Sequence, residues 1–259
     1  MVRYEQSWLW TPRPRHRPAL RLICFPHAGG SARFFRPWAD GLPDSVELAA
    51  VRYPGRDERD GEPVPGHLDA LARPTAKALA EPGDVPLALF GHGMGAALAF
   101  ETARLLTAGH VPSPRALFVS GHPAPTESRS REPWRGDDEP VTALRRLTGA
   151  DGVPPDTVYA DLRLARSYRY RPGPPLACPV TALLGRHDTR VGARQADAWR
   201  ACTTGPFTLR AMPGDHFYLV PRRAELIAFL LTSLGGAKSV PPGATPRPPA
   251  PPRSRRPHR

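Results

Sequence analysis

Short apolar runs recur along the chain, and a turn rich in Gly or Pro follows each of them. These runs lie at residues 20–25, 46–51, 87–90, 116–120, 180–184 and 207–212. Continuous apolar runs of this length, bounded by turn residues, are typical of buried parallel strands. Residues 94–106 and 225–234 instead carry Leu, Ile and Phe at helical spacing. This alternation predicts an α/β protein with a doubly wound, mostly parallel sheet.

The polar motifs of the chain come directly after these predicted strands. PHAGGS follows the first, GHGMG the third, GRHD the fifth and PGDH the sixth. In open α/β sheets, ligands bind outside the carboxyl ends of the strands. We therefore expect the four motifs to meet at one edge of the sheet.

One segment interrupts the alternation of strands and helices. From Ser128 to about Tyr168 the chain is polar and then carries short helix-like pieces, among them VTALRRL and YADLRLARSY. The segment lies between the fourth and fifth predicted strands. A long insertion at this place predicts a short helical lid over the site.

Residues 85–95, VPLALFGHGMG, have the layout of a nucleophile elbow. In this motif, G-x-S-x-G, a tight strand-to-helix turn presents a serine oxygen above the sheet. The small positions of the motif are Gly91, Gly93 and Gly95. The serine position is Gly93, which has no side chain and therefore no nucleophilic oxygen.

The partners of such a nucleophile are present in the expected order. An acyl-transfer triad needs a histidine as base and a carboxylate that orients it, and in α/β-hydrolases the acid precedes the histidine. Asp188 follows the fifth predicted strand and His216 follows the sixth. Taken alone, each also fits an ordinary loop residue, but their joint order behind Gly93 predicts an acid–base pair.

An oxyanion hole requires two backbone N–H groups that face the developing charge. The residue after the nucleophile normally supplies one, which is Met94 here, and the loop at residues 27–30 (HAGG) can supply the second. Neither amide depends on a side chain at position 93. The same loop also fits a simple tight turn.

The 259 residues and a hydrophobic fraction of 40% suit one α/β domain, predicted over residues 1–236. Half of the net charge of +12 falls in the last 22 residues, which hold six basic residues, eight prolines and no acidic residue. We expect residues 237–259 to form a disordered, Pro- and Arg-rich tail. No aromatic residues alternate with its arginines, so we expect no nucleic-acid partner.

The remaining composition excludes several other classes. The three cysteines, Cys24, Cys178 and Cys202, are widely spaced, which argues against a disulfide framework and against a metal site. The N-terminus holds no apolar stretch long enough for a signal peptide, and no run is long enough to span a membrane. These features predict a cytoplasmic protein without a membrane partner.

A dinucleotide-binding protein is a distant alternative. GHGMGA fits the G-x-G-x-x-A fingerprint and follows a predicted strand. That fingerprint also requires an acidic residue at the end of the next strand. The next predicted strand, ALFVS, is followed by GHPAP, which contains no acidic residue.

Six segments together resemble the type II thioesterases that accompany polyketide synthases and nonribosomal peptide synthetases. They are FPHAGGSARFF, RYPGRDER, LFGHGMGAALAFE, SYRYRPGPPL, CPVTALLGRHD and TTGPFTLRAMPGDHFYL. The resemblance runs from about Leu20 to Leu234. It implies an α/β-hydrolase that removes aberrant or stalled acyl groups from the phosphopantetheine thiol of acyl or peptidyl carrier domains in antibiotic biosynthesis. It also implies a monomer that needs no cofactor.

By the matching motif positions, the acid is Asp188, the base is His216, and the oxyanion amides are those of Ala28 and Met94. The nucleophilic serine of the family falls on Gly93, so we expect the hydrolysis to be impaired. A water molecule activated by His216 can replace the covalent step. The alternative is a catalytically dead or repurposed protein that still binds acyl carriers.

Two further features concern substrate and partner. Between GADGVPPD and LRLARSYRY the family carries more helical sequence than this chain, which predicts a shortened lid. Arg33 and Arg56 lie in motifs near the expected site mouth. They can contact an acidic carrier surface, or they can be ordinary solvated arginines.

Overall fold

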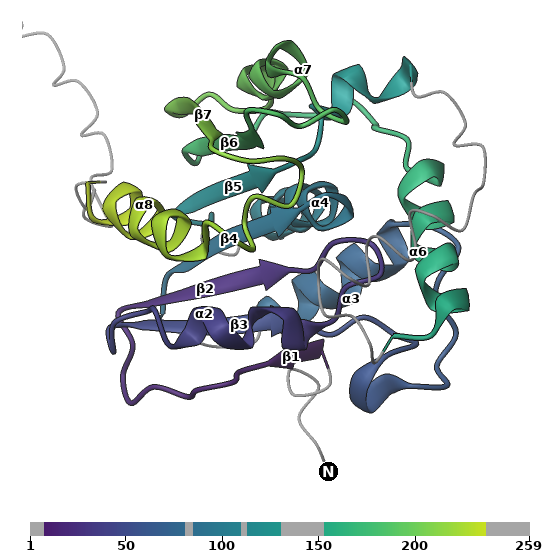
Figure 1. Cartoon of the computed structure of the whole chain (residues 1–259), viewed down its shortest axis with the longest axis horizontal. Helices are drawn as coiled ribbons and strands as arrows, with labels where there is room; N and C mark the ends of the chain where they lie inside the picture. The colour runs from purple at the N-terminus through teal and green to yellow at the C-terminus, as the bar shows by residue number, and fades with distance from the viewer. Residues whose placement is uncertain (1–7, 81–84, 110–112, 131–152, 237–259) are drawn as a thin grey trace, which may run out of the picture.

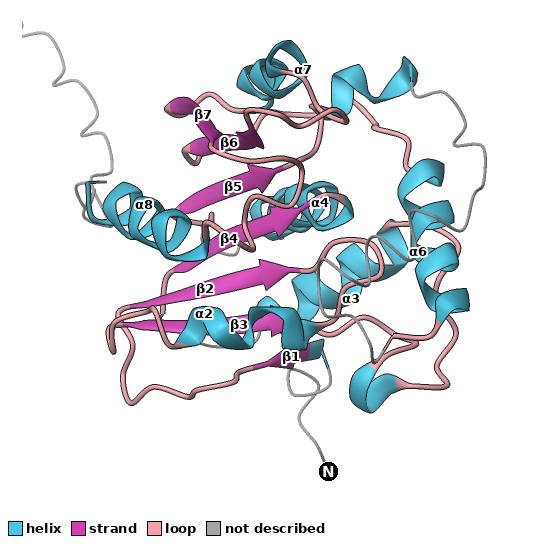
Figure 2. Cartoon of the chain, in the orientation of Figure 1, coloured by secondary structure: helices cyan, strands magenta, loops and turns pink. Residues whose placement is uncertain are grey.

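A seven-stranded sheet forms the centre of the computed structural model, with the strand order β1-β3-β2-β4-β5-β6-β7 (Figures 1 and 2). The structure describes residues 8–80, 85–109, 113–130 and 153–236. The strands are β1 (Leu9–Trp10), β2 (Leu20–Phe25), β3 (Val46–Val51), β4 (Leu87–His92), β5 (Ala116–Ser120), β6 (Val180–Gly185) and β7 (Phe207–Met212). Only β1 pairs in the antiparallel direction, with β3. The predicted doubly wound, mostly parallel sheet is therefore confirmed.

All six predicted strands are present, and β4 and β6 extend slightly beyond their predicted ends. The two-residue strand β1 was not predicted. It is too short to show a pattern in the sequence, and it is held to the sheet by two residue pairs with β3, Leu9 with Val51 and Trp10 with Ala50.

Helices cover both faces of the sheet. They are α2 (Arg36–Ala39), α3 (Asp69–Leu79), α4 (Met94–Ala108), α6 (Pro155–Ser167), α7 (Ala193–Asp197) and α8 (Arg223–Gly236). Short 3₁₀ helices span Ala32–Phe35, Asp57–Arg59, Pro125–Ser130 and Ala198–Cys202. The predicted helices at 94–106 and 225–234 correspond to α4 and α8. Helix α3 was missed because Pro74 lies inside it, and Pro normally interrupts a helix.

Two apolar clusters stabilise the layers of the fold. One cluster packs α3, α4 and α7 against residues such as Ile23 and Leu89, and the other packs α2 and α8 against residues such as Leu22 and Phe90. Successive side chains of a strand point to opposite faces. Because both faces are covered by helices, nearly every residue of the central strands is apolar.

The direction in which successive strands are added to the sheet reverses between β2 and β4. The chain goes from β2 to β3 on one side and then returns to β4 on the other side. At such a switch point the loops after the two strands separate and leave a crevice. The loop after β2 is HAGG and the turn after β4 contains Gly93, so two of the expected motifs flank this crevice.

The predicted lid is described in part. Its second helix-like piece is α6, which crosses the carboxyl-end edge of the sheet (Figure 1). Residues 131–152, with VTALRRL, lie outside the described residues, as does the predicted tail at 237–259. Within the described part of the chain, no helix has both the length and the apolar character needed to cross a lipid bilayer.

Candidate active site

The turn between β4 and α4 is held tightly by two of its three glycines. A Cβ atom at Gly91 would lie 2.1 Å from the Gly95 carbonyl oxygen, and one at Gly95 would lie 2.2 Å from the Phe25 carbonyl oxygen. Real side chains do not tolerate such contacts. These glycines therefore allow α4 to approach both its own strand and the end of β2.

Gly93 differs from its two neighbours. A Cβ atom built on it would meet one atom within 4 Å, the His27 Cβ at 3.7 Å, which is an ordinary contact. Its backbone, however, has φ 55° and ψ −122°, a conformation that L-amino acids rarely adopt. The turn thus has the strained geometry of a nucleophile elbow. The space around residue 93 admits a Cβ atom, and the sequence supplies none.

Asp188 and His216 lie together, as expected from their order in the chain. His216 Nδ1 is 2.8 Å from Asp188 Oδ2. The end of β6 packs against the His216 loop so closely that a Cβ at Gly185 would lie 2.0 Å from the Asp215 carbonyl oxygen. This contact brings the loop after β7 beside the loop after β6.

The electrostatics of the pair determine which histidine nitrogen is free. Burial tends to raise the pKa of Asp188, but its hydrogen bonds with His216 and with the Arg190 and Val191 amides hold that pKa below its ordinary value. Asp188 is therefore a carboxylate and can only accept a hydrogen bond. The proton between the two residues belongs to His216 Nδ1, and Nε2 is left as the basic nitrogen.

The end of β5 and the residue that follows it connect Gly93 to His216. The Gly93 N–H donates to the Ser120 carbonyl oxygen at 2.9 Å, and a Cβ at Gly121 would lie 3.0 Å from His216 Cε1. Gly93 and the His216 ring therefore both lie against the end of β5, Gly93 against Ser120 and His216 against Gly121. The structure brings together the three expected positions of the triad.

The two expected oxyanion amides are also placed at this edge. Met94 is the first residue of α4, and the first N–H groups of a helix have no acceptor within it. In the HAGG loop, the Gly29 and Gly30 N–H groups have acceptors, whereas the Ala28 N–H makes no hydrogen bond with the described residues. Ala28 and Gly93 are partly exposed, while His27 and Met94 beside them are buried.

Two further histidines lie against the site. Burial and the nearby charges of His216 and Arg56 lower the pKa of His27 to about 3, and burial lowers that of His92 well below its ordinary value. His27 packs edge-on against Phe34 and Phe217. Neither of its ring nitrogens has a hydrogen-bond partner among the described residues. Both histidines are therefore neutral packing elements of the site wall.

A buried serine–histidine pair was not anticipated from the sequence. Ser120 Oγ lies 2.9 Å from His92 Nδ1 and 2.6 Å from the Tyr218 hydroxyl, and all three side chains are inaccessible to solvent. The register of β4 and β5, which pairs His92 with Ser120, creates this contact. Strand pairing cannot be read from one sequence, so no local signal identified it.

The expectation for Arg56 is wrong. Its side chain is 1% exposed and pairs with the fully buried Asp161 of α6, with Nη1 2.6 Å from Oδ2 and Nη2 2.7 Å from Oδ1. A buried, paired guanidinium cannot contact a partner protein or be a solvated arginine. The Arg56 side chain points inward because it pairs with the buried carboxylate of Asp161, 105 residues later in the chain.

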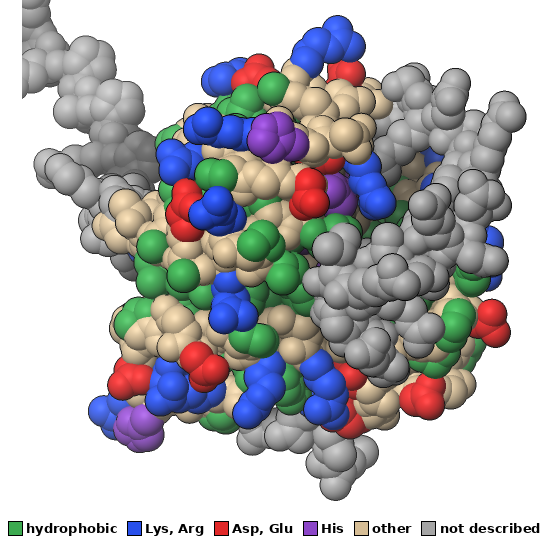
Figure 3. Space-filling view, viewed as in Figure 1, with side chains coloured by type: hydrophobic (Ala, Val, Ile, Leu, Met, Phe, Trp, Pro, Cys, Tyr) green, Lys and Arg blue, Asp and Glu red, His purple; other side chains and the backbone are tan. Residues whose placement is uncertain are grey.

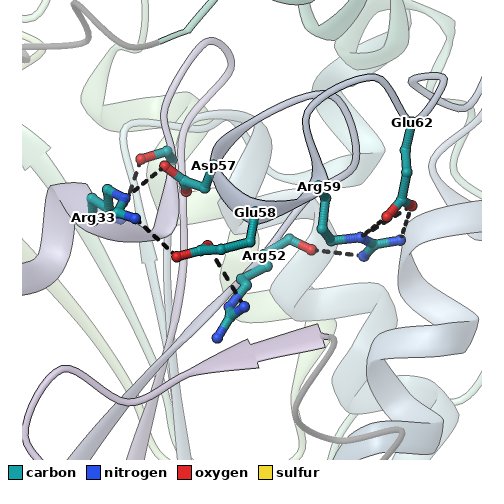
Figure 4. Close-up of polar contacts among 7 residues, drawn as sticks. Arg33, Arg52, Asp57, Glu58, Arg59 and Glu62 are labelled. Carbon is teal, nitrogen blue, oxygen red and sulfur yellow. Dashed lines mark hydrogen bonds and ion pairs between the residues drawn. The ribbon is translucent and has the colours of Figure 1, made fainter. Parts of the chain in front are cut away.

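Arg33 does lie at the surface, with 60% of its side chain exposed. It pairs with Asp57 at 3.1 Å and with Glu58 at 2.8 Å, and Glu58 also pairs with Arg52 (Figure 4). The face shown in Figure 3 likewise carries basic and acidic side chains side by side.

Two other kinds of site were sought in the described part of the chain. That part contains no group of three or more His, Cys, Asp or Glu side chains arranged to hold a metal ion. A cavity of about 520 Å³ lies between α3, α4 and residues 167–176, with Arg73, Arg104 and Tyr168 in its wall. None of the expected site residues lines this cavity.

Comparison with known proteins agrees with this geometry. The family model described as "Thioesterase domain" matches residues 20–234. Thioesterase PikA5 of Streptomyces venezuelae is 38% identical over 259 residues, which covers 94% of this chain and 92% of that protein.

Solved structures extend the likeness to three dimensions. The type II thioesterase BorB from the borrelidin biosynthetic cluster is 41% identical, with a TM-score of 0.79 over 88% of this chain and 98% of that one. YbtT, a type II thioesterase from the yersiniabactin pathway, is 30% identical, with a TM-score of 0.76 over 90% of this chain and 100% of that one. The chain belongs to the thioesterase family of α/β-hydrolase fold, among relatives that are type II thioesterases of polyketide and nonribosomal peptide pathways.

Proposed function

We propose that this protein hydrolyses acyl thioesters on the phosphopantetheine arm of acyl or peptidyl carrier domains, as an editing enzyme of antibiotic biosynthesis. The observation that carries the proposal is the pair of His216 and Asp188, 2.8 Å apart, beside the strained turn at Gly93. The relatives that are type II thioesterases of polyketide and nonribosomal peptide pathways support this substrate class.

Each site residue has a role in this reaction. Asp188 holds His216 in the tautomer that leaves Nε2 free to accept a proton. The N–H groups of Ala28 and Met94 stabilise the negative charge that develops on the thioester carbonyl oxygen. The roles of Ala28 and Met94 require only backbone atoms.

Gly93 changes the chemical route. No acyl-enzyme can form at residue 93, because glycine has no side-chain oxygen. In the proposed route a water molecule loses a proton to His216 Nε2 while its oxygen attacks the thioester carbon. The tetrahedral intermediate then collapses, the C–S bond breaks, and the imidazolium returns the proton to the leaving thiolate, which yields a free acid and the carrier thiol.

We expect this route to be slow. Removal of a serine nucleophile typically costs on the order of 10⁶ in kcat, and the remaining oxyanion and binding groups retain roughly 10³–10⁴ over the uncatalysed reaction. The protein therefore acts either as a weak thioesterase or, in the limit, as a binder of acyl carriers.

Ser120 offers a second route to hydrolysis, because it hydrogen-bonds to His92. Its complete burial argues against this role, since a nucleophile must reach the acyl carbon. Its bond to the Tyr218 hydroxyl also occupies the same oxygen. The geometry is that of a structural link between β4, β5 and the loop after β7.

The deciding experiment measures hydrolysis of a radiolabelled acyl-phosphopantetheinyl carrier protein by the unsubstituted chain and by its His216→Ala and Ser120→Ala variants. We expect slow hydrolysis that disappears with His216→Ala and persists with Ser120→Ala. Activity that persists with His216→Ala contradicts the water route, and activity lost only with Ser120→Ala assigns the nucleophile to Ser120. Carrier binding without hydrolysis in any variant identifies the protein as a binder.

A further inference from the structure

The ion pair of Arg56 and Asp161 is the most deeply buried pair of opposite charges that the structure describes close to the site. Both guanidinium nitrogens Nη1 and Nη2 reach the carboxylate, and the two side chains are 1% and 0% exposed. Removing two charges from water is costly, and a buried ion pair is weak evidence for added stability. The burial of Arg56 and Asp161 therefore needs an explanation other than a gain in the free energy of unfolding.

Both members of the pair also bind the HAGG loop. Asp161 Oδ2 accepts a hydrogen bond from the Gly29 N–H at 2.7 Å, and Arg56 Nη1 donates to the Gly30 carbonyl oxygen at 2.8 Å. On the other side of the loop, the Tyr53 hydroxyl donates to the Pro26 carbonyl oxygen at 3.0 Å. Anchors thus lie on both sides of Ala28.

The turn that carries Arg56 is itself constrained. Gly55 and Asp57, on either side of Arg56, have φ values of 79° and 52°. A positive φ at a residue other than Gly is strained and persists only where the surroundings enforce it. Here Arg33 Nε binds Asp57 Oδ1 at 3.1 Å (Figure 4). The residues on either side of Arg56 therefore hold an unusual backbone conformation.

We propose that Arg56 and Asp161 are positioning residues for the oxyanion loop. They fix Gly29 and Gly30, so that the Ala28 N–H faces the acyl carbonyl oxygen above position 93. Because Asp161 belongs to α6, they also make the position of this amide depend on the helix of the lid. The inference rests on the proposed thioester hydrolysis, since it concerns the amide that would stabilise the oxyanion. Donors in such sites must be held to within about 0.5 Å.

The kinetic test uses the Gly93→Ser chain as parent, in which we expect acyl transfer to be measurable. Asp161→Asn keeps the shape but removes the charge, and Arg56→Met with Asp161→Leu removes both charges, so that neither is left buried alone. Thr157→Val is the matched control, because Thr157 also joins α6 to a backbone carbonyl, that of Gly55 at 3.1 Å, but makes no hydrogen bond with the HAGG loop among the described residues.

We expect kcat to fall about 100-fold in Asp161→Asn and in the charge-free double variant, with KM changed less than about threefold. Thr157→Val should stay within about twofold of the parent. A folded double variant with the kcat of the parent overturns the proposal, and so does an equal loss with Thr157→Val. Thermal unfolding of each variant identifies a folding defect.

A second measurement, made on the chain with Gly93, does not depend on catalysis. In ¹⁵N-labelled protein, the amide resonances of Ala28 and Gly29 should move in the charge-free double variant and stay in place in Thr157→Val, while Met94 serves as internal reference. If Gly93→Ser hydrolyses nothing, the proposed function fails and these resonances alone decide the inference. Unmoved Ala28 and Gly29 resonances overturn it in either case.

Discussion

Replacing Gly93 with serine should convert this protein into an efficient thioesterase. A Cβ at this position meets only the His27 Cβ at 3.7 Å, so the first atom of the serine side chain fits without displacing a neighbour. The restored nucleophile should raise kcat by several orders of magnitude, up to the order of 10⁶, or about 8 kcal/mol of transition-state stabilisation. The assay is single-turnover release of the acyl group from a carrier protein.

The same substitution should lower stability. The backbone at position 93 has φ 55° and ψ −122°, and holding a residue other than Gly there costs about 1–3 kcal/mol. For a domain of this size, that cost corresponds to a fall in Tm of roughly 2–10 °C.

Gly93→Ala is the matched control, because it introduces the same strain without an oxygen. It should lower Tm by a similar amount and leave kcat unchanged. If Gly93→Ser shows no more activity than Gly93→Ala while both remain folded, the assignment of His216, Asp188 and the oxyanion amides is refuted.

Three other predictions address neighbouring features of the site. In the Gly93→Ser chain, His216→Ala should remove most of the restored kcat, by about 10⁴-fold or more, and a loss below tenfold would exclude His216 as the base. His27 is neutral when folded, with its pKa lowered to about 3, whereas the unfolded chain takes up this proton near pH 6.5. The free energy of unfolding should therefore fall as pH drops below 6.5. Between pH 7 and pH 5, His27→Leu should lose about 2 kcal/mol less of this free energy than the unsubstituted chain, measured by urea unfolding. An equal loss in both proteins would contradict the lowered pKa. Gly95→Ala should destabilise the fold by about 1–3 kcal/mol or more, because its Cβ would meet the Phe25 carbonyl oxygen at 2.2 Å. Gly235→Ala, with no atom within 4 Å of its Cβ, should not destabilise it.

Much of the fold and of the candidate site could be predicted from short segments of the sequence. Apolar runs bounded by Gly and Pro located six strands, because strands buried on both faces must be apolar throughout. The order of the strand-end motifs predicted that Gly93, Asp188 and His216 would meet, since parallel strands present their carboxyl ends at one edge. Both inferences need only short windows of sequence.

The contacts that complete the site depend on packing between distant segments. Arg56 pairs with Asp161, which lies 105 residues later in the chain. His92 contacts Ser120 because the register of β4 and β5 places them side by side. Nothing in the local pattern around Arg56 distinguishes a buried arginine from a surface one. The sequence by itself located the strands of the sheet and the tight turn at Gly93, and it predicted that Asp188 and His216 would lie together. Only the packing of the helices on the sheet decided which charged groups are buried and which backbone amides they bind. The reason is that a charge can be buried only with a partner, and here a distant part of the chain supplies that partner.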